Sequence, residues 1–362
     1  MPYHKQLIWK QKQINMLLGK FCKPEKIIGM LNPENYRNKL QAIYRVTKDG
    51  KIISGVYQSS NNGIVATDSC MLTDKEANSI SATLKKLFLS FKIRPYNPAN
   101  NCGLVKNVII RCGNSTGEIM VVIIVSKNTE AFSRSFVNAL VKAHPRIRTI
   151  AITVNSKNKL LNGTNEKIIY GDGKILTKIC SCNFLLSPNS FFQVNSLQTE
   201  VLYSTAINFA ELNKEDTVID AYCGVGTIGI IAAKNVKNVF GVELNPYAVQ
   251  DAKENAKLND VQNISFMEDD SGNFMNNLVN NNKKIDVVFT DPPRSGCTIK
   301  FLNSLVKLSP SKIVYISCNP NTLERDLRFL NRFKYKVNKI QPIDMFPYTN
   351  HVETVVLISK VN

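Results

Sequence analysis

The segment that decides the fold spans residues 217–227, with the sequence TVIDAYCGVGT. An apolar run of β type ends at Asp220, a turn with two glycines follows, and an apolar helical pattern begins directly after it. A strand, a glycine-rich turn and a helix in this order form the nucleotide-binding unit of an open α/β sheet. Gly224, Gly226 and Gly229 complete a G-x-G-x-x-G pattern, which is compatible with any nucleoside-bearing cofactor.

Two carboxylates near this turn distinguish between cofactors. Glu243 ends the next predicted strand, about 20 residues farther on, where an acid can bind both ribose hydroxyls. Asp220 stands where it would repel a pyrophosphate but could face the amino group of a methionine moiety. Glu243 suits NAD and S-adenosylmethionine equally, whereas Asp220 favours S-adenosylmethionine. The alternative is that Asp220 is a surface acid in an ordinary strand–helix turn.

The surrounding pattern predicts a doubly wound, Rossmann-like α/β sheet. Strands are expected at residues 217–220, 238–243, 264–267, 285–291 and 311–317, followed by a strand pair at 334–345 and 351–359. Helices are expected at residues 197–212, 228–235, 246–258, 300–308 and 323–331. Strands that alternate with helices are typical of a parallel sheet, and the final pair would form its antiparallel edge.

Composition points to a polyanionic partner. The chain has 362 residues and a net charge of +18, from 46 Lys and Arg against 28 acids. Such an excess favours nucleic acid, although coding bias in an AT-rich genome can also raise the lysine content. Nine cysteines without a disulfide framework fit a reducing compartment. Because no signal peptide or membrane-spanning run is evident, we expect a cytoplasmic protein without a membrane partner.

An α+β part is predicted upstream of the doubly wound sheet. Residues 1–21 have the pattern of a basic amphipathic helix, either packed on a neighbouring domain or in contact with RNA. Its apolar side chains are Leu7, Ile8, Ile14, Leu17 and Leu18. Hairpins are expected at Asp49-Gly50 and 113–117, helices at 73–91 and 132–143, and a loop-rich connection at 155–173. We therefore divide the chain into an N-terminal helix (1–27), a central domain (28–180) and a C-terminal domain (181–362).

Cys318 is a candidate nucleophile. It follows the apolar run 313–316, at the carboxyl end of a predicted strand, where open α/β sheets place their ligand crevice. A thiolate there could form a covalent intermediate, although free cysteine is often only a small buried hydrophobe. Cys180 and Cys182 form a C-x-C pair without a second pair at zinc-like spacing, so a metal site is weakly supported.

Two further segments add polar groups to the same sheet edge. The loop 291–296 (DPPRSG) begins with Asp291 and carries Arg294, which could meet an RNA phosphate or pair with a carboxylate. Glu353 lies within an apolar run, so partial burial would raise its pKa and suit it to general-base work. The alternative is an edge-strand glutamate that faces solvent. His351 could orient Glu353 or the substrate, or be purely structural.

Together these segments resemble the RNA uracil-C5 methyltransferase family. The matching motifs, in the family's order, are 187–195 (SPNSFFQVN), 220–226 (DAYCGVG), 291–296 (DPPRSG), 317–320 (SCNP) and 346–353 (FPYTNHVE). The resemblance extends more weakly upstream. It implies an S-adenosylmethionine-dependent enzyme that makes 5-methyluridine in RNA.

The resemblance also assigns roles to residues. Cys318 would be the nucleophile that adds to uracil C6, and Glu353 the base that removes the C5 proton. The residues that would line the cofactor and substrate pocket are Gln193, Tyr222, Gly224, Glu243 and Asp291. The target base would be flipped into this pocket.

Four further expectations concern the iron–sulfur cluster, the RNA target, the rival functions and the oligomeric state. Many relatives begin with an oligonucleotide-binding barrel and an iron–sulfur cluster, but Cys70 lacks its partner cysteines here, so we expect no cluster. The residues of the motifs are more similar to those of the 23S rRNA enzymes than to those of the tRNA T-loop enzymes, which remain the alternative. A non-catalytic RNA-binding protein on an inactive fold and an amino-group methyltransferase are the rivals. We expect a monomer.

Overall fold

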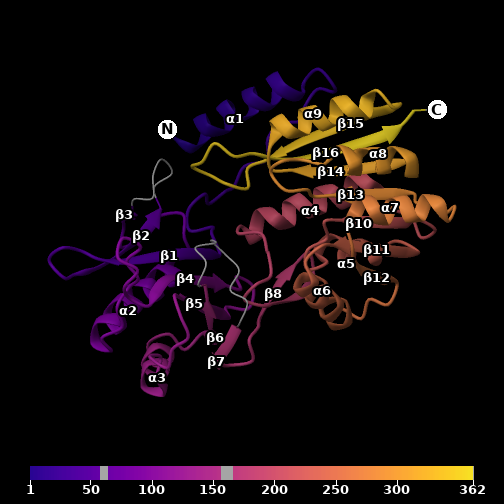
Figure 1. Cartoon of the computed structure of the whole chain (residues 1–362). Coiled ribbons are helices and arrows are strands. Elements are labelled where there is room, and N and C mark those ends of the chain that lie inside the picture. Colours follow the sequence, from indigo (N-terminus) through magenta and orange to yellow (C-terminus); the bar gives the residue numbers. More distant parts are fainter. Residues whose placement is uncertain (58–63, 156–165, 362) are drawn as a thin grey trace. The chain divides into compact units, whose positions relative to one another are not determined.

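The computed structural model describes residues 1–57, 64–155 and 166–361, which form two compact units (Figure 1). The first unit consists of Met1–Pro33, Ile179–Phe184 and Ser190–Asn362. The second consists of Glu34–Lys178 and Leu185–Asn189. The N-terminal segment therefore groups with the C-terminal part of the chain.

The first unit is built on a seven-stranded sheet with the order β12-β11-β10-β13-β14-β16-β15. Its strands are β10 (Thr217–Ala221), β11 (Asn238–Glu243), β12 (Ile264–Glu268), β13 (Val287–Thr290), β14 (Lys312–Ser317), β15 (Tyr335–Ile343) and β16 (Glu353–Lys360). The first five are parallel, whereas β16 is antiparallel to β14 and to β15. The predicted doubly wound sheet with an antiparallel edge is confirmed. The strand order reverses at β10, so the crevice lies beyond the carboxyl ends of β10 and its neighbours.

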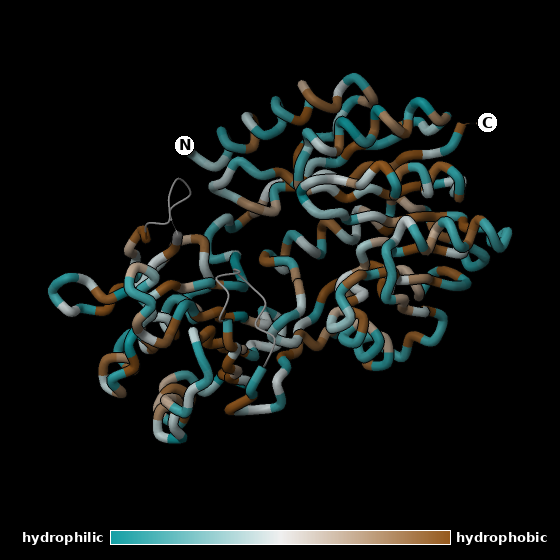
Figure 2. Tube along the Cα trace, in the orientation of Figure 1, coloured by the Kyte–Doolittle hydropathy of each residue, from teal (hydrophilic) through white to brown (hydrophobic). Residues whose placement is uncertain are grey.

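Helices cover this sheet in two layers (Figure 1). One layer contains α1 (Tyr3–Leu18), α9 (Pro320–Asn331), α8 (Ile299–Leu308) and α7 (Ser271–Asn280), and the other contains α4 (Ser196–Ala210), α5 (Thr227–Ala233) and α6 (Pro246–Leu258). Figure 2 shows that the strands between the layers are largely hydrophobic. Ile14 and Leu18 of α1 join the same core as Phe301 and Leu327, so α1 is an integral part of this unit.

The buried face of α1 differs from the one predicted. Gln6, Lys10, Ile14 and Leu18 are buried, whereas Ile8 is 68% exposed. Ile8 therefore does not belong to the packed face. A polar residue can take part in the buried stripe when it finds a buried partner, which hydropathy alone does not indicate.

Helix α7 was not predicted from the sequence. Its segment, SGNFMNNLVN, contains four asparagines and a glycine, which are poor helix formers. The helix is stabilised by its cap, because Asp270 accepts a hydrogen bond from the Asn273 backbone N–H at 3.0 Å. It is also stabilised by packing, since Gly272 lies close against the Phe301 backbone of α8. Tertiary contacts override propensity here.

The second unit has a seven-stranded sheet with the order β3-β2-β1-β4-β5-β6-β7. Its elements are β1 (Lys39–Val46), β2 (Ile52–Tyr57), β3 (Ile64–Ala66), α2 (Lys75–Ser90), β4 (Val105–Cys112), β5 (Ile119–Val125), α3 (Arg134–Ala143), β6 (Ile147–Val154) and β7 (Glu166–Tyr170). Only the β5–β6 pair is parallel among these strands. This is the predicted α+β arrangement.

The expectation of a loop at 155–173 is wrong where the structure describes it. Residues 156–165 lie outside the described residues, but Glu166–Tyr170 form strand β7 against β6. The strand is largely exposed and lacks an apolar alternation, so it depends on backbone pairing rather than on a buried face. Farther on, β8 (Ile175–Ile179) and β9 (Cys182–Leu186) form a two-stranded sheet that the sequence did not predict. In the described part of the chain, no helix is both long and apolar enough to cross a membrane.

Candidate active site

Cys318 and Glu353 are brought together by the pairing of β14 with β16. Ser317 and Thr354 are the last paired residues of the ladder, so Cys318 and Glu353 are the next residues on the two strands. Cys318 is half-buried and Glu353 is only 3% exposed. The reading of Glu353 as an edge-strand residue facing solvent is therefore wrong, because β16 lies between β14 and β15.

The electrostatics of this pair favour neutral groups at rest. Burial raises the pKa of Cys318 to about 11, with further contributions from the charges of Glu353 and Asp291, while Arg294 opposes the shift. Burial also raises the pKa of Glu353 to about 8; Asp291 adds to this and Arg294 again opposes it. A carboxyl group with a pKa near neutrality is suited to accepting and returning a proton.

Arg294 stands at the exposed side of this pair. Its guanidinium nitrogen lies 3.2 Å from Nε2 of His351, and its carbonyl oxygen accepts hydrogen bonds from Asn319 and Thr322 at 3.0 and 3.3 Å. These bonds fix the loop of Arg294 against the start of α9, directly after Cys318. His351 therefore contacts Arg294, a role that the sequence left open.

Helix α4 contributes a residue that the sequence did not single out. Tyr203 is 6% exposed, and burial raises its pKa well above the ordinary value, as do the charges of Asp291, Asp220 and Glu353. Gln193 hydrogen-bonds to Tyr203 and opposes the shift. A tyrosine among apolar helix residues carries no distinctive sequence signal. Its charged neighbours place it beside the carboxylates of the site.

The glycine turn is held by the two acids predicted around it. Asp220 accepts a hydrogen bond from the Gly229 N–H at 2.7 Å through one oxygen. Glu243 accepts from the Gly224 N–H at 3.1 Å and from the Asn245 N–H at 2.9 Å. The acids therefore shape the turn as well as bordering the crevice.

These residues fit S-adenosylmethionine. The second carboxyl oxygen of Asp220 is buried without a protein partner, as expected for an atom that awaits an ammonium group. Gly224 has open space where a Cβ would stand, so a ligand can approach the backbone there. Each oxygen of Glu243 retains a lone pair for a ribose hydroxyl. The backbone of Tyr222 has a positive φ of 62°, and the centre of its ring lies 5.2 Å from the centre of the Phe301 ring.

Gly226 offers a test of the turn. Its φ is +82° and an added Cβ would lie 2.7 Å from the Phe266 ring, so we expect Gly226→Ala to destabilise the protein by about 2–4 kcal/mol and to weaken S-adenosylmethionine binding. Gly50 has a φ of +80° with nothing near its Cβ position. Gly50→Ala should therefore cost only about 1 kcal/mol. Equal losses in thermal unfolding would contradict the proposed steric clash.

The buried carboxyls predict a pH dependence of stability. Burial raises the pKa of both Asp220 and Asp291 to about 7, and that of Glu353 to about 8. The folded protein therefore keeps protons that the unfolded chain has lost, so stability should fall as pH rises from about 4 to 8. Asp220→Asn should make this fall in the free energy of unfolding smaller by up to about 4 kcal/mol.

A control with the opposite sign is Asp286. Partial burial raises the pKa of Asp286, but the hydrogen bond from Lys284 contributes to a net lowering. The stabilisation of the fold by the ionised Asp286 side chain is therefore present above pH 4 and is lost on acidification. Asp286→Asn should therefore reduce stability at neutral pH, whereas Asp220→Asn should increase it. Denaturant unfolding of the ligand-free protein between pH 4 and 8 checks both signs. A flat profile for the wild type would contradict the prediction.

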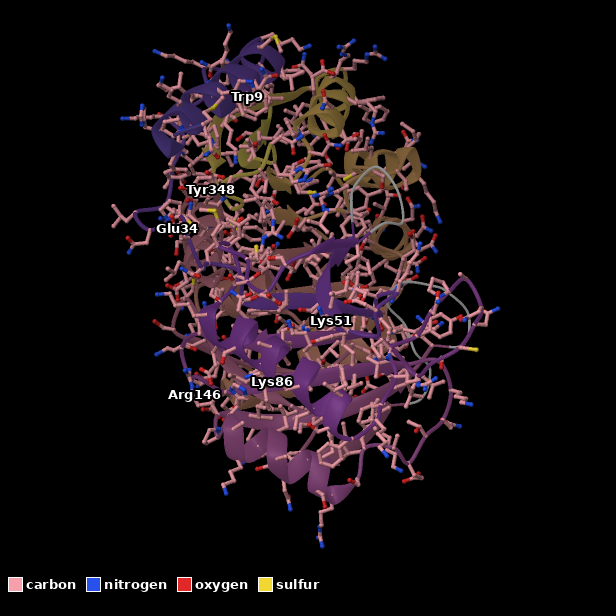
Figure 3. The ribbon with its side chains drawn as sticks, turned by 90° about the vertical axis from the view of Figure 1, so that its left-hand side faces the viewer. Trp9, Glu34, Lys51, Lys86, Arg146 and Tyr348 are labelled. Carbon is pink, nitrogen blue, oxygen red and sulfur yellow. The ribbon has the colours of Figure 1, made fainter. Side chains whose placement is uncertain are left out.

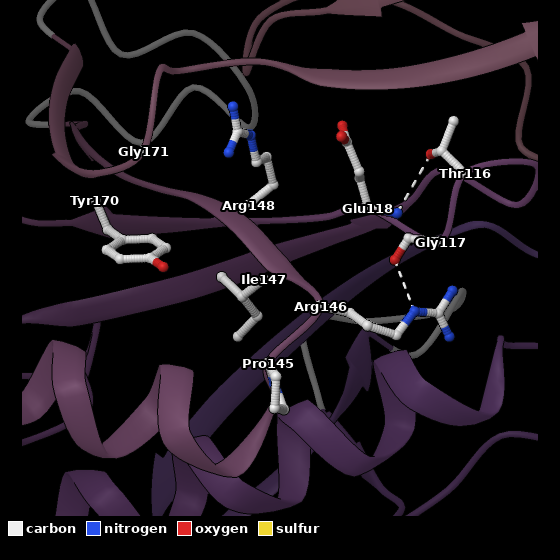
Figure 4. Close-up of a pocket in the computed structure, with 9 residues that line it drawn as sticks. All are labelled: Thr116, Gly117, Glu118, Pro145, Arg146, Ile147, Arg148, Tyr170 and Gly171. Atoms are coloured by element: carbon white, nitrogen blue, oxygen red, sulfur yellow. Dashed lines mark hydrogen bonds between the residues drawn. The ribbon is translucent and has the colours of Figure 1, made fainter.

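A separate pocket of about 470 Å³ lies in the second unit (Figure 4). Its lining includes Arg146, Arg148 and Tyr170, but none of the predicted site residues. Both guanidinium groups are engaged, since Arg146 binds Glu76 at 2.6 Å and Arg148 binds Asp172 at 2.7 Å. The pocket therefore lacks the chemistry of the crevice described above. Within the described ranges, no group of three or more His, Cys, Asp or Glu is placed to hold a metal ion.

Comparison with known proteins identifies the relatives of this chain. The sequence matches the tRNA (uracil-5-)-methyltransferase family over residues 2–361. An uncharacterized RNA methyltransferase of Halalkalibacterium halodurans is 38% identical, over 100% of this chain and 80% of that protein. One of Oceanobacillus iheyensis is 36% identical, over 98% of this chain and 79% of that protein.

A solved structure is also similar. The Pyrococcus abyssi tRNA (uracil-54, C5)-methyltransferase in complex with S-adenosyl-L-homocysteine has a TM-score of 0.82 and 28% identity, and the match covers 99% of this chain and 84% of that one. The fold and these likenesses define an S-adenosylmethionine-dependent RNA methyltransferase. The chain belongs to the tRNA (uracil-5-)-methyltransferase family, which confirms the resemblance found in its motifs.

Proposed function

We propose that this enzyme methylates C5 of a uridine through a covalent adduct between Cys318 and C6 of the base. The observation that carries the proposal is the placement of Cys318 and Glu353 at neighbouring strand ends, on the same edge of the sheet as the turn that fits S-adenosylmethionine. Uracil C5 is a weak nucleophile, so the reaction needs a group that first adds to C6. A cysteine and a carboxyl group are the minimum pair for this chemistry.

Addition is the first task of the site. The sulfur of Cys318 forms a bond to C6 while the C5–C6 π electrons move toward C5 and the C4 oxygen, which gives an enolate. The thiol proton must leave, and the carboxylate of Asp291, whose charge acts on the thiol, is the available acceptor, so that Glu353 stays free to act as the base of the second step. Bound S-adenosylmethionine supplies the electrophilic methyl group.

Elimination is the second task. Once C5 carries the methyl group, the Glu353 carboxylate removes the remaining C5 proton, the C5–C6 double bond re-forms, and the bond from C6 to sulfur breaks. The departing thiolate of Cys318 then takes back the proton held by Asp291, and Glu353 releases the C5 proton to solvent. Glu353 is suited to this step because its raised pKa makes its carboxylate a stronger base than an exposed glutamate. Arg294 would stabilise the negative charge on the Cys318 sulfur and on the Glu353 carboxylate.

We infer that the RNA target is 23S rRNA. The inference is supported by the wording of the motifs at 220–226 and 351–353, which is closer to the rRNA enzymes of the family. The tRNA T-loop is the second candidate, favoured by the likeness to an enzyme that acts on uracil-54 of tRNA. We further propose that the enzyme acts as a monomer.

Methyl transfer to defined RNAs tests the proposal. The protein is incubated with radiolabelled S-adenosylmethionine and with unmodified transcripts of 23S rRNA and of tRNA, and the modified nucleoside is identified. Formation of 5-methyluridine in 23S rRNA supports both parts. Methylation of tRNA alone would contradict 23S rRNA as the target but would still support the proposed chemistry at C5. Absence of methylation from both RNAs, or a methyl group elsewhere than C5, would refute the proposal.

A further inference from the structure

Helix α1 has an outer face that combines positive charge with exposed apolar side chains. Lys5, Ile8, Trp9, Lys12 and Met16 lie on this face, at the three- to four-residue spacing of one helix side, and all five are exposed. The exposed fractions of Ile8, Trp9 and Met16 are 68%, 41% and 67%. Residues 1–24 contain no Asp or Glu. Large apolar side chains gathered in this way on a surface indicate a binding site.

The inner face of α1 is fixed to the loop that leads to the catalytic pair. Lys10 forms an ion pair with Asp344 at 2.7 Å, and both side chains are fully buried. The Tyr3 hydroxyl donates to the other carboxyl oxygen of Asp344 at 2.9 Å. Gln6 accepts a hydrogen bond from the Tyr348 N–H at 2.9 Å. Three residues of α1 therefore hold the segment 344–348, shortly before Glu353.

An exposed aromatic residue lies between this helix and the mouth of the site. Tyr348 is 37% exposed, and its ring centre lies 6.0 Å from that of Tyr3 on α1. Figure 3 labels Trp9 on α1 and Tyr348 on the loop between β15 and β16. Three residues beyond Tyr348 comes His351, which contacts Arg294 beside Cys318. Tyr348, His351 and Arg294 thus form a series of aromatic and basic groups from the loop that α1 holds to the nucleophile.

We propose that the outer face of α1 (Lys5, Ile8, Trp9, Lys12 and Met16) binds the RNA substrate next to the target uridine. The two lysines would contact phosphates, and the Trp9 indole would stack on an unpaired base. The acid-free helix and the net charge of +18 are complementary to RNA. The proposal rests on the proposed function, since it assigns the RNA-binding surface of the same site.

Binding of an unmodified 23S rRNA transcript to the full-length protein tests this surface. Lys5→Gln/Lys12→Gln should weaken binding about tenfold and reduce the slope of log affinity against log salt by about 1.5, as expected for two lost phosphate contacts. Trp9→Ala should weaken binding about tenfold with an unchanged slope, because stacking releases no counterions. Neither change should alter S-adenosylmethionine affinity in calorimetry.

Matched controls are available elsewhere in the same unit, on α8 and in the turn after α9. Lys300 and Lys307 are exposed on α8 with the same seven-residue spacing, and Phe333 is 43% exposed, close to the value for Trp9. Lys300→Gln/Lys307→Gln and Phe333→Ala should leave RNA affinity near that of the wild type. Equal losses in the control and test variants would show a general charge or folding effect and overturn the proposal.

Two other outcomes would also overturn it. Wild-type affinity and salt slope in both α1 variants would show that RNA does not contact this face. A wild-type dimer that Trp9→Ala converts to a monomer, with RNA affinity unchanged, would assign the face to a second copy of the chain. Failure of the proposed function is distinguishable, because RNA binding is measured independently of methyl transfer and can be repeated in a Cys318→Ala background.

Discussion

Cys318→Ala is expected to abolish methyl transfer, with a loss of more than about a thousandfold, because it removes the sulfur that we propose forms the bond to C6. The side chain is half-buried and the change removes only a sulfur atom, so the protein should remain folded. S-adenosylmethionine should still bind, since the turn at Gly224 and the acid Glu243 are unchanged. Methyl transfer to unmodified RNA and calorimetric titration with the cofactor measure the two effects.

Cys180→Ala is a suitable control for this loss. Cys180 is also half-buried and also belongs to the first unit, but it lies at the turn between β8 and β9, where its sulfur is 3.5 Å from Ser204 Oγ. Its removal should leave activity near that of the wild type. Retained activity in Cys318→Ala would exclude the covalent mechanism while leaving methyl transfer itself intact.

Glu353→Gln is expected to stop the reaction after methyl transfer and to accumulate a covalent complex of protein and RNA. Glutamine keeps the shape of the side chain but cannot remove the C5 proton, so the C6–sulfur bond persists. Turnover should fall by about 10²–10⁴. The complex should appear as a protein band of reduced mobility in denaturing gels, and it should contain one methyl group from labelled S-adenosylmethionine.

The double variant Cys318→Ala/Glu353→Gln provides the control for this complex. It should form no slow band, because the attachment atom is missing. Glu324→Gln is a second control, since Glu324 pairs with Arg328 at the surface of α9 rather than facing the site. A Glu353→Gln protein that turns over normally would transfer the role of base to another group, and Asp291 would be the first to examine.

The sheet of the first unit could be predicted from sequence because most of its strands are short apolar runs bounded by turns. Helix α7 and strand β7 could not, for a shared reason. The asparagine-rich segment of α7 has weak propensity, and β7 lacks an apolar face, so both depend on neighbours distant in sequence. Ile8 was assigned to the wrong face because the buried ion pair of Lys10 determines how α1 is rotated.

As candidates, Cys318 and Glu353 were accessible from sequence because each lies at or next to the end of a strand, beside a recognisable motif. Their electrostatic environment was not. The raised pKa of Glu353 depends on burial between β14 and β15 and on the charge of Asp291, which only the strand order reveals. Tyr203 was missed because nothing in the sequence distinguishes it from its apolar neighbours in α4. Only the fold brings it close to carboxylates.

The buried pair of Lys10 and Asp344 has a consequence for how the chain is made. Its partners are 334 positions apart, so synthesis of the second follows the first by on the order of half a minute. During that time the ammonium group of Lys10 remains in water, and α1 cannot dock. Most of the second unit, Glu34–Lys178, is continuous and can fold meanwhile. Helix α1 is therefore among the last elements to reach its final place, although it is made long before the segment that carries Asp344.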